Sequence, residues 1–361
     1  MPCAIICFIL FVIFFFVKDI MFACYRSNNK EFDYLEMEQI DFSEITGLKV
    51  GNAQTLRAAT GCTIVICEKG AVVGVDVRGG APGTRETDLL NPVNLVQQAH
   101  AVLLAGGSAF GLDAAAGVMQ YLEEHNIGFD VQVTKVPIVC GAALFDLTIG
   151  DHKVRPDRKM GYQACVDAGL KDKKTIKCEH GSIGAGTGAT IGKILGMNHA
   201  MKSGLGSFAL QEGKFKIGAL VAVNCLGDVI DPLTNEILAG PLNNDNSINC
   251  TEDIMIKSLS DKKNFFSGNT TIGVIATNAD FTQSQATKLA SMAQNGYARA
   301  IRPAHSMYDG DTIFAMSAGD VQADLSVAGL LAARVMERAV VSAVKGATSL
   351  FGLQCYNDLK G

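Results

Sequence analysis

The stretch Gly268-Asn269-Thr270-Thr271-Ile272-Gly273-Val274-Ile275-Ala276-Thr277 places a threonine at the start of an apolar, β-branched run. Such a run predicts a buried strand over residues 271–276, with Thr270 directly before its N-terminal end. A threonine there gains an unusual property if the chain is cut between Asn269 and Thr270. Its hydroxyl then lies beside a free α-amine, whose ordinary pKa of roughly 7.7–8.0 makes it a built-in base near neutral pH. Thr270 is therefore a candidate N-terminal nucleophile, and the chain would have to make the cut itself.

The same residues have a simpler interpretation. Thr-Thr-Ile before Val-Ile is ordinary strand composition, and Asn269 is an ordinary turn residue ahead of it. The acidic pair in Asp309-Gly310-Asp311 would supply polar groups to a nucleophile, and its two carboxylates would share one face if the segment is extended. Taken alone, residues 308–311 are also typical of a loop. The motif by itself leaves both interpretations open.

Hydrophobic patterning along the chain predicts a mixed α/β fold. Hairpins and helices are segregated, which favours stacked layers over a strictly alternating parallel sheet. The polar stretch 242–269 is typical of a surface linker, and it leads into the proposed cut. The predicted elements are a hairpin of strands 63–67 and 72–77 around Glu68-Lys69-Gly70, helices 92–105 and 110–124, strands 215–223 and 271–276, a helix 283–297, a strand pair flanking 309–311, and a helix 321–346.

Composition limits the classes of function. The chain has 361 residues, is 48% hydrophobic and carries a formal net charge of −5, which describes a globular protein with an ample core and disfavours nucleic acid as a partner. Its 11 cysteines and 6 histidines show no metal-ligand spacing, so we expect no metal. An odd number of cysteines in apolar surroundings favours reduced core thiols and a reducing compartment.

Three glycine-rich segments approach known motifs without meeting their requirements. The segment that ends at Lys193 has Thr187 where a phosphate loop needs its first glycine. Residues 184–189 fit a relaxed dinucleotide fingerprint, but the charged segment 171–180 stands where the preceding strand is required. Residues 106–110 lack the glycine that follows the serine of a nucleophile elbow. None of the three indicates a cofactor.

The N-terminus carries an apolar run over residues 3–17. The run is shorter than the roughly 20 residues of a membrane span, and it lacks the basic segment that begins a signal peptide. Lys18, Arg26 and Lys30 all follow it, so the positive-inside rule places the catalytic domain in the cytosol if the run is a membrane anchor. Membrane attachment, a signal peptide and an incorrectly assigned start codon are the alternatives.

The chain carries five short blocks in the following order: residues 45–52 (ITGLKVGN), 78–86 (RGGAPGTRE), 104–112 (LAGGSAFGL), 184–189 (GAGTGA) and 269–271 (NTT). Together they resemble the DmpA-type L-aminopeptidase D-esterase/amidase family, which also contains β-aminopeptidases and nylon-oligomer endohydrolases. A threonine after Asn269 is more similar to the nylon-oligomer branch. Phe145 departs from the family pattern, since some members carry a pocket tyrosine in its region.

The resemblance implies a four-layer α/β/β/α sandwich, similar to N-terminal-nucleophile hydrolases but with its own connectivity. It further implies a precursor that processes itself. The expected organisation is an N-terminal segment 1–40 and one catalytic domain 41–361, cut into 41–269 and 270–361. Units of this kind would assemble into a homo-oligomer.

The resemblance also implies roles for individual residues. Thr270 matches the nucleophile, Asp309 and Asp311 match the acidic pair that polarises it, and Lys193 and Asn224 match supporting polar residues. Asn224 follows an apolar run, where a side-chain amide can donate to an oxyanion, although a plain turn residue is the alternative. Lys193 would be a cation that keeps the nucleophile's amine neutral, although lysines are mostly exposed.

These observations predict a self-processing aminopeptidase or amidase without a cofactor. Thr270 would attack amide or ester bonds of small peptides or amino-acid amides. One alternative is an endo-acting amidase like the nylon-oligomer hydrolases. The other is a non-catalytic binding or scaffold protein that keeps the fold.

Overall fold

The computed structural model describes residues 37–170, 177–259 and 268–360. Residues Gln39–Gly361 form one compact unit. The apolar run 3–17, and with it the prediction of membrane attachment, lies outside the described part of the chain. Among the residues that are described, no helix combines the length and the apolar character that crossing a membrane requires.

Within the described residues, ten strands form one mixed sheet in the order β1-β11-β12-β15-β17-β3-β5-β8-β4, with β2 paired to β3. These strands are β1 (Glu38–Ile40), β2 (Lys49–Thr55), β3 (Thr60–Val77), β4 (Thr84–Arg85), β5 (Gln98–Ala105), β8 (Val139–Ala143), β11 (Leu205–Glu212), β12 (Phe215–Asn224), β15 (Thr270–Ala279) and β17 (Thr312–Val321). Among the described residues there are also two two-stranded sheets, of β6 (Phe129–Asp130) with β7 (Lys135–Val136) and of β9 (Thr190–Ile191) with β10 (Met201–Lys202). A three-stranded sheet pairs β13 (Asp228–Ile230) with β14 (Ile237–Ala239) and β16 (Ile301–Arg302). The helices are α2 (Ala114–Glu124), α3 (Arg158–Leu170), α4 (Thr251–Lys257), α5 (Gln283–Ala300) and α6 (Leu325–Lys345).

Both halves of the sheet share the long strand β3. In its first half, Ile64 and Ile66 pack with residues of α2 and α3, whereas Val65 packs into the core on the opposite face. This alternation is the normal period of a strand with two covered faces. The first half pairs with β2 and the second half with β17, so the strand carries the chain from one half of the sheet to the other.

The predicted hairpin around Glu68-Lys69-Gly70 is wrong, because residues 60–77 are one continuous strand. Gly70 has φ +79°, in the region that favours glycine. At the same place, the register of β3 against β5 shifts between Ile66 and Ala71. An irregularity of this kind bends a strand without reversing it. The turn-like residues therefore mark a bulge.

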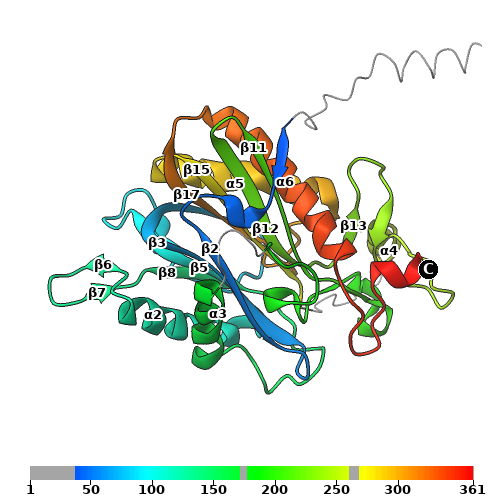
Figure 1. Ribbon diagram of the computed structural model, residues 1–361. Helices are drawn as coiled ribbons and strands as arrows, with labels where there is room; N and C mark the ends of the chain where they lie inside the picture. Colours follow the sequence, from blue (N-terminus) through cyan, green and yellow to red (C-terminus); the bar gives the residue numbers. More distant parts are fainter. Residues whose placement is uncertain (1–36, 171–176, 260–267, 361) are drawn as a thin grey trace, which may run out of the picture. The chain divides into compact units, whose positions relative to one another are not determined.

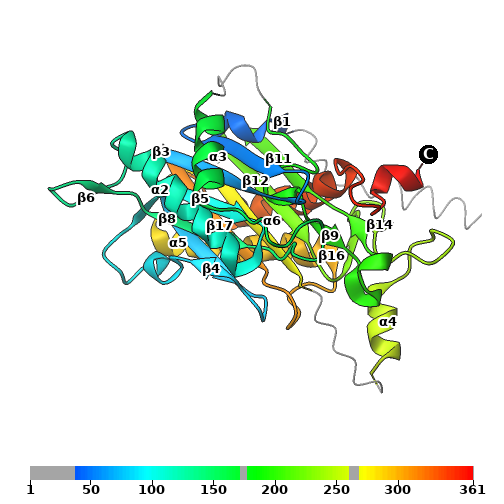
Figure 2. The ribbon, with the colours of Figure 1, turned by 90° about the horizontal axis from the view of Figure 1, so that it is seen from below.

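Helices cover both outer faces of the bent sheet, which gives the four layers α/β/β/α (Figure 1). Helices α2 and α3 lie against β2, β3, β5 and β8, and α5 and α6 lie against β3, β17, β11 and β12. Figure 2 shows the same layers from below. Between the two halves, one core cluster joins Val65 and Leu104 to Leu220, Ile272 and Phe314. The predicted fold class is confirmed, and removal of this apolar surface from water is its main stabilisation.

The predicted helix 92–105 is wrong, since residues 98–105 form strand β5. β5 lies between β3 and β8, and residues 99–105 are all buried. A strand covered on both faces shows a continuous apolar run instead of alternation, and periodicity cannot separate such a run from a buried helix.

Other predicted elements agree with the structure to different degrees. The helix predicted over 110–124 begins only at Ala114, after a 3₁₀ turn. The strand pair around Asp309-Gly310-Asp311 is half correct, because β17 follows the segment but β16 pairs with β13. The predicted linker 242–269 contains helix α4. Strands β12 and β15 and helices α5 and α6 lie where the pattern predicts them.

Candidate active site

Thr270 is the first residue of β15 and points into the space between the two halves of the sheet. It shares its strand face with Ile272 and Val274 of the inner core and is 4% exposed. On the neighbouring strand β12, Asn224 lies directly opposite it. The Thr270 hydroxyl donates to the carbonyl of Asn269. The candidate nucleophile therefore lies against the peptide bond that the sequence predicts to be cut.

Lys193 is a buried cation beside this bond. Its Nζ donates to the Asn224 carbonyl at 3.0 Å, to Asn224 Oδ1 at 2.9 Å and to the Gly268 carbonyl at 3.1 Å. Three acceptors satisfy all three N–H groups of an ammonium. Burial lowers the pKa of Lys193 to about 7, against the opposing effect of nearby acidic groups. Lys193 is therefore buried, whereas most lysines in proteins are exposed.

Asn224 has every polar atom of its side chain engaged. Its Oδ1 accepts from the Thr190 backbone at 3.0 Å in addition to Lys193. Its Nδ2 donates to the Phe145 carbonyl at 3.0 Å and, more weakly, to the Gly268 carbonyl at 3.4 Å. The amide is therefore fixed in orientation, with its donor side toward the chain that leads into Thr270.

The two acidic side chains come from the loop before β17, the strand that flanks β15 on the side away from β12. Asp311 Oδ1 accepts from the Thr271 backbone at 2.9 Å. Asp309 accepts from the Leu226 backbone at 3.3 Å and from the hydroxyl of Ser306. Burial, reinforced by repulsion from Asp311, raises the pKa of Asp309 to about 6. Gly310, between the two, packs against the Thr270 hydroxyl.

A second segment, Arg78 to Ala81, supports the acidic loop. The Gly80 backbone donates to the Ser306 carbonyl at 3.1 Å, and the Ala81 backbone donates to the Asp309 carbonyl at 2.8 Å. This segment begins the block 78–86 of the sequence. Its contribution to the site could not be read from residue types, because it acts through its backbone.

A cavity of about 130 Å³ opens beside Thr270. Among the residues that the structure describes, neither acidic nor basic side chains line it. The polar side chains in this part of the wall, besides those of Asn269 and Thr270, are Ser108 and Tyr308, and sequence reasoning missed both as site residues. Ser108 lies within the block 104–112, and Tyr308 directly precedes Asp309, so proximity to these motifs was the available signal. The lining consists of Ala81, Pro82, Gly83, Ser108, Ala109, Ala143, Phe145, Gly268, Asn269, Thr270 and Tyr308.

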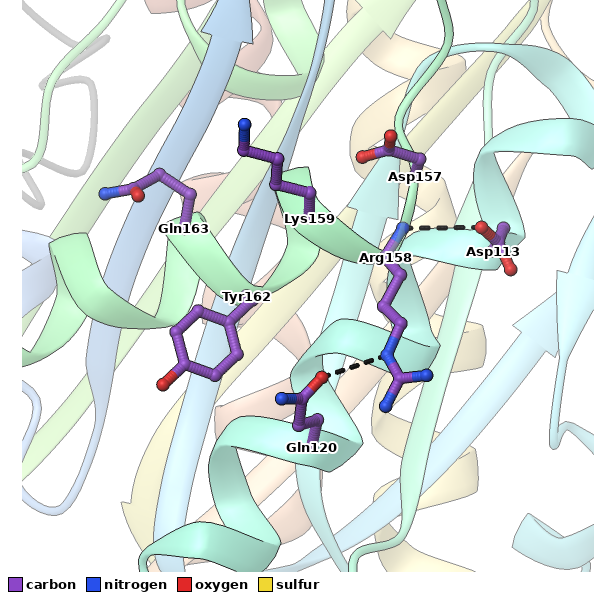
Figure 3. A pocket seen from close by; sticks show the side chains of 7 residues that line it. All are labelled: Asp113, Gln120, Asp157, Arg158, Lys159, Tyr162 and Gln163. Atoms are coloured by element: carbon purple, nitrogen blue, oxygen red, sulfur yellow. Dashed lines mark hydrogen bonds between the residues drawn. The ribbon is translucent and has the colours of Figure 1, made fainter.

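A larger groove of about 580 Å³ lies on the outer helix layer, between α2 and α3 (Figure 3). Arg158 crosses it, with its backbone donating to Asp113 at 3.3 Å and its Nε donating to Gln120 at 2.9 Å. These contacts tie the two helices together, and the groove contains no residue of the Thr270 site. As to metals, the described residues contain no group of three or more His, Cys, Asp or Glu side chains placed to hold an ion.

The structure thus brings Thr270, Asn224, Lys193, Asp309 and Asp311 together around one buried peptide bond. Comparison with known proteins gives this arrangement a context. The family model described as Peptidase family S58 matches residues 41–356.

Two curated relatives and one solved structure are similar to this chain. An uncharacterized aminopeptidase of Mycobacterium leprae is 40% identical over 343 residues, covering 87% of this chain and 92% of the relative. A 6-aminohexanoate-oligomer endohydrolase of Paenarthrobacter ureafaciens is 29% identical over 335 residues, covering 86% of each. The L-aminopeptidase D-Ala-esterase/amidase of Ochrobactrum anthropi, described as a variant of the Ntn hydrolase fold, has a TM-score of 0.67 at 17% identity, covering 89% of this chain and 92% of that one.

Proposed function

The chain belongs to peptidase family S58 and is a hydrolase of that family, and on this premise we propose that Thr270 is its nucleophile and is freed by self-cleavage after Asn269. One observation carries the proposal. A buried threonine at the start of a central strand presents its hydroxyl to the preceding carbonyl, with a buried lysine, an oriented amide and two carboxylates around it.

Self-cleavage would begin when the Thr270 hydroxyl attacks the carbonyl carbon of Asn269. The C–N bond then breaks, the Thr270 nitrogen takes up the hydroxyl proton, and an ester joins Asn269 to Thr270 Oγ1. Water hydrolyses this ester, which leaves a carboxylate on Asn269 and a free amine on Thr270. Lys193 and Asn224 hold the Gly268 carbonyl before the bond that breaks, and Asp311 holds the Thr271 N–H after it, so the chain is restrained on both sides.

The freed amine would then serve as the base for substrate turnover. It accepts the hydroxyl proton as Thr270 attacks a substrate amide or ester, and it returns the proton to the leaving amine or alcohol. The Lys193 cation disfavours a second positive charge nearby and so helps to keep this amine neutral. Water finally hydrolyses the acyl-enzyme. We propose small peptides and amino-acid amides as substrates, and assembly of the cut αβ units into a homo-oligomer.

A second candidate, an endo-acting amidase, is favoured by one specific observation. The carbonyl of Gly268, one residue before the cut, is held by Lys193 at 3.1 Å. The cavity wall has no acidic side chain among its described residues. A substrate with an amide carbonyl in the place of Gly268 would be held in the same way, whereas a free ammonium there would be repelled by the Lys193 cation.

Intact-mass measurement and N-terminal sequencing of the purified protein test the proposal. We expect two fragments, one of which begins at Thr270, from the natural chain and from Thr270→Ser, and a single uncut chain from Thr270→Ala. An uncut natural chain that is folded by circular dichroism would rule out the mechanism and favour a non-catalytic scaffold. Matched amides with free and acetylated amines then separate the two enzyme candidates, because only endo action tolerates the blocked amine.

A further inference from the structure

The Asp311 carboxylate accepts from three N–H groups, and two of them belong to one residue. Its Oδ1 accepts from the Thr271 backbone at 2.9 Å. Its Oδ2 accepts from the His305 backbone at 2.9 Å and lies 3.1 Å from His305 Nδ1. Because an ionised carboxylate only accepts, Nδ1 is the donor of this contact. His305 therefore fixes one carboxylate oxygen, and the other oxygen fixes the residue that follows Thr270.

His305 is itself held by its surroundings. Its backbone lies in the left-handed region, with φ +58°. Its ring packs on Tyr297 of α5, with centroids 6.3 Å apart and planes inclined by 40°. Asp311 is 1% exposed, so the hydrogen bond from His305 is shielded from water and correspondingly strong. His305 does not line the cavity beside Thr270, and its side-chain hydrogen bond runs to Asp311.

We infer that His305 is a positioning residue for the reaction of Thr270. The inference rests on the proposed function and adds a residue to it. The ring N–H of His305 orients the Asp311 carboxylate, and this carboxylate holds the Thr271 N–H. That second hydrogen bond sets the start of β15, where Thr270 presents its hydroxyl. Loss of the ring donor leaves Oδ2 with the His305 backbone N–H as its only donor among these contacts, which loosens the carboxylate while the cavity wall stays unchanged. The rates of self-cleavage and of turnover should therefore fall, and KM should not.

Two substitutions whose side chains have nearly the same shape as each other separate the effect of the hydrogen-bond donor from the effect of side-chain shape. His305→Asn places an amide N–H near the position of Nδ1, and asparagine tolerates a left-handed backbone. His305→Asp has the same size and backbone tolerance but presents a carboxylate to Asp311. We expect self-cleavage rate and kcat within about threefold of the natural protein for His305→Asn, and reduced about ten- to hundredfold for His305→Asp, with KM unchanged in both.

His180→Ala is the matched control. His180 is also a histidine with a side-chain partner, the Ser207 hydroxyl at 2.7 Å in a part-buried contact, and it lies outside the site. We expect it to lower the melting temperature without changing kcat. Circular dichroism verifies that each variant is folded. Two results would overturn this inference and leave the proposed function standing, provided that the natural chain is cut and active. In the first, His305→Asp has the self-cleavage rate and kcat of the natural protein. In the second, His305→Asn loses as much of both rates as His305→Asp. A natural chain that remains uncut overturns the proposed function and this inference together.

Discussion

The backbone of Gly310 lies so close to Thr270 that a methyl group on residue 310 would stand 2.7 Å from Thr270 Oγ1. It would also stand 2.8 Å from the carbonyl of Ala81. Both distances are shorter than real contacts of such a carbon. The glycine between the two aspartates is therefore what allows the acidic loop to close over the nucleophile.

Gly310→Ala should slow self-cleavage by at least about tenfold, because the added carbon displaces either the hydroxyl or the loop, and small misplacements of reacting groups are costly. The measurement is the fraction of cut chain over time after purification. Gly169→Ala on the outer helix α3 is the control, since its added carbon meets only the end of the Tyr121 side chain. Equal rates for both variants and the natural protein would show that the close approach is irrelevant.

Gly268→Ala should also impair self-cleavage, for a different reason. Gly268 has φ +68°, and an added Cβ would meet the Phe145 ring at 2.1 Å. The substitution therefore disturbs the carbonyl that Lys193 and Asn224 hold. Phe145→Ala added to Gly268→Ala should restore part of the rate, since it removes the collision but not the backbone strain. Absence of any rescue in the double variant would assign the whole effect to the backbone.

The turnover of the processed enzyme should fall as pH drops below about 6. Burial raises the pKa of Asp309 to about 6, and its protonation removes a negative charge beside the Lys193 cation. In Asp309→Asn we expect kcat/KM about tenfold lower, with the loss of activity near pH 6 absent and only the loss that follows protonation of the Thr270 amine remaining. Asp228→Asn is the matched control, because burial raises the pKa of Asp228 to about 6 as well, but its partner is Thr251. If the loss of activity near pH 6 disappears in Asp228→Asn and persists in Asp309→Asn, its assignment to Asp309 is wrong.

Lys202 offers a test of stability outside the site. Its Nζ donates to the carbonyls of Gly186 and Ala189, each at 3.1 Å, and to that of Ser203, so Lys202→Met should cost about 3 kcal/mol by leaving buried acceptors unpaired. Burial lowers the pKa of Lys202 to about 7. Between about pH 7 and the unfolded value of 10.5, the unfolded chain binds more protons than the folded chain, so stability rises with pH in that window.

Lys202→Met should therefore show a smaller rise in unfolding free energy between pH 7 and pH 9.5 than the natural protein, as measured by urea denaturation. The rise should not vanish, because the buried Lys193 contributes in the same direction. Lys216→Met is the control. Lys216 also donates to a backbone carbonyl, that of Glu44 at 3.0 Å, but at the surface, where such a contact adds little.

The sequence was informative where a residue's chemistry and its strand pattern coincide. Thr270 at the start of a β-branched run predicted both strand β15 and the position of the candidate nucleophile. The sequence was uninformative where the position of a side chain depends on partners that are distant along the chain. The burial of Lys193 follows from acceptors at Asn224 and Gly268, which only the folded chain brings to it.

Two further misses have physical causes of the same kind. The apolar run of β5 lacks alternation because neighbours cover both of its faces, so it was mistaken for a helix. His305 precedes the acidic pair in an irregular segment, and its contact with Asp311 depends on a left-handed backbone conformation that residue type does not predict. Local periodicity describes regular elements, whereas this part of the site is built from loops.

Strands β15 and β17 lie side by side in the middle of the sheet, with β12 on one side and β3 on the other. Both flanking strands precede Asn269 in the chain, and both central strands follow it. A cut after Asn269 would therefore yield a noncovalent heterodimer in which two strands of the second polypeptide lie between strands of the first. Their separation would require the sheet to unfold, so the pieces should comigrate in native gels, resist exchange with pieces of other molecules, and fail to recover activity when mixed after separate refolding.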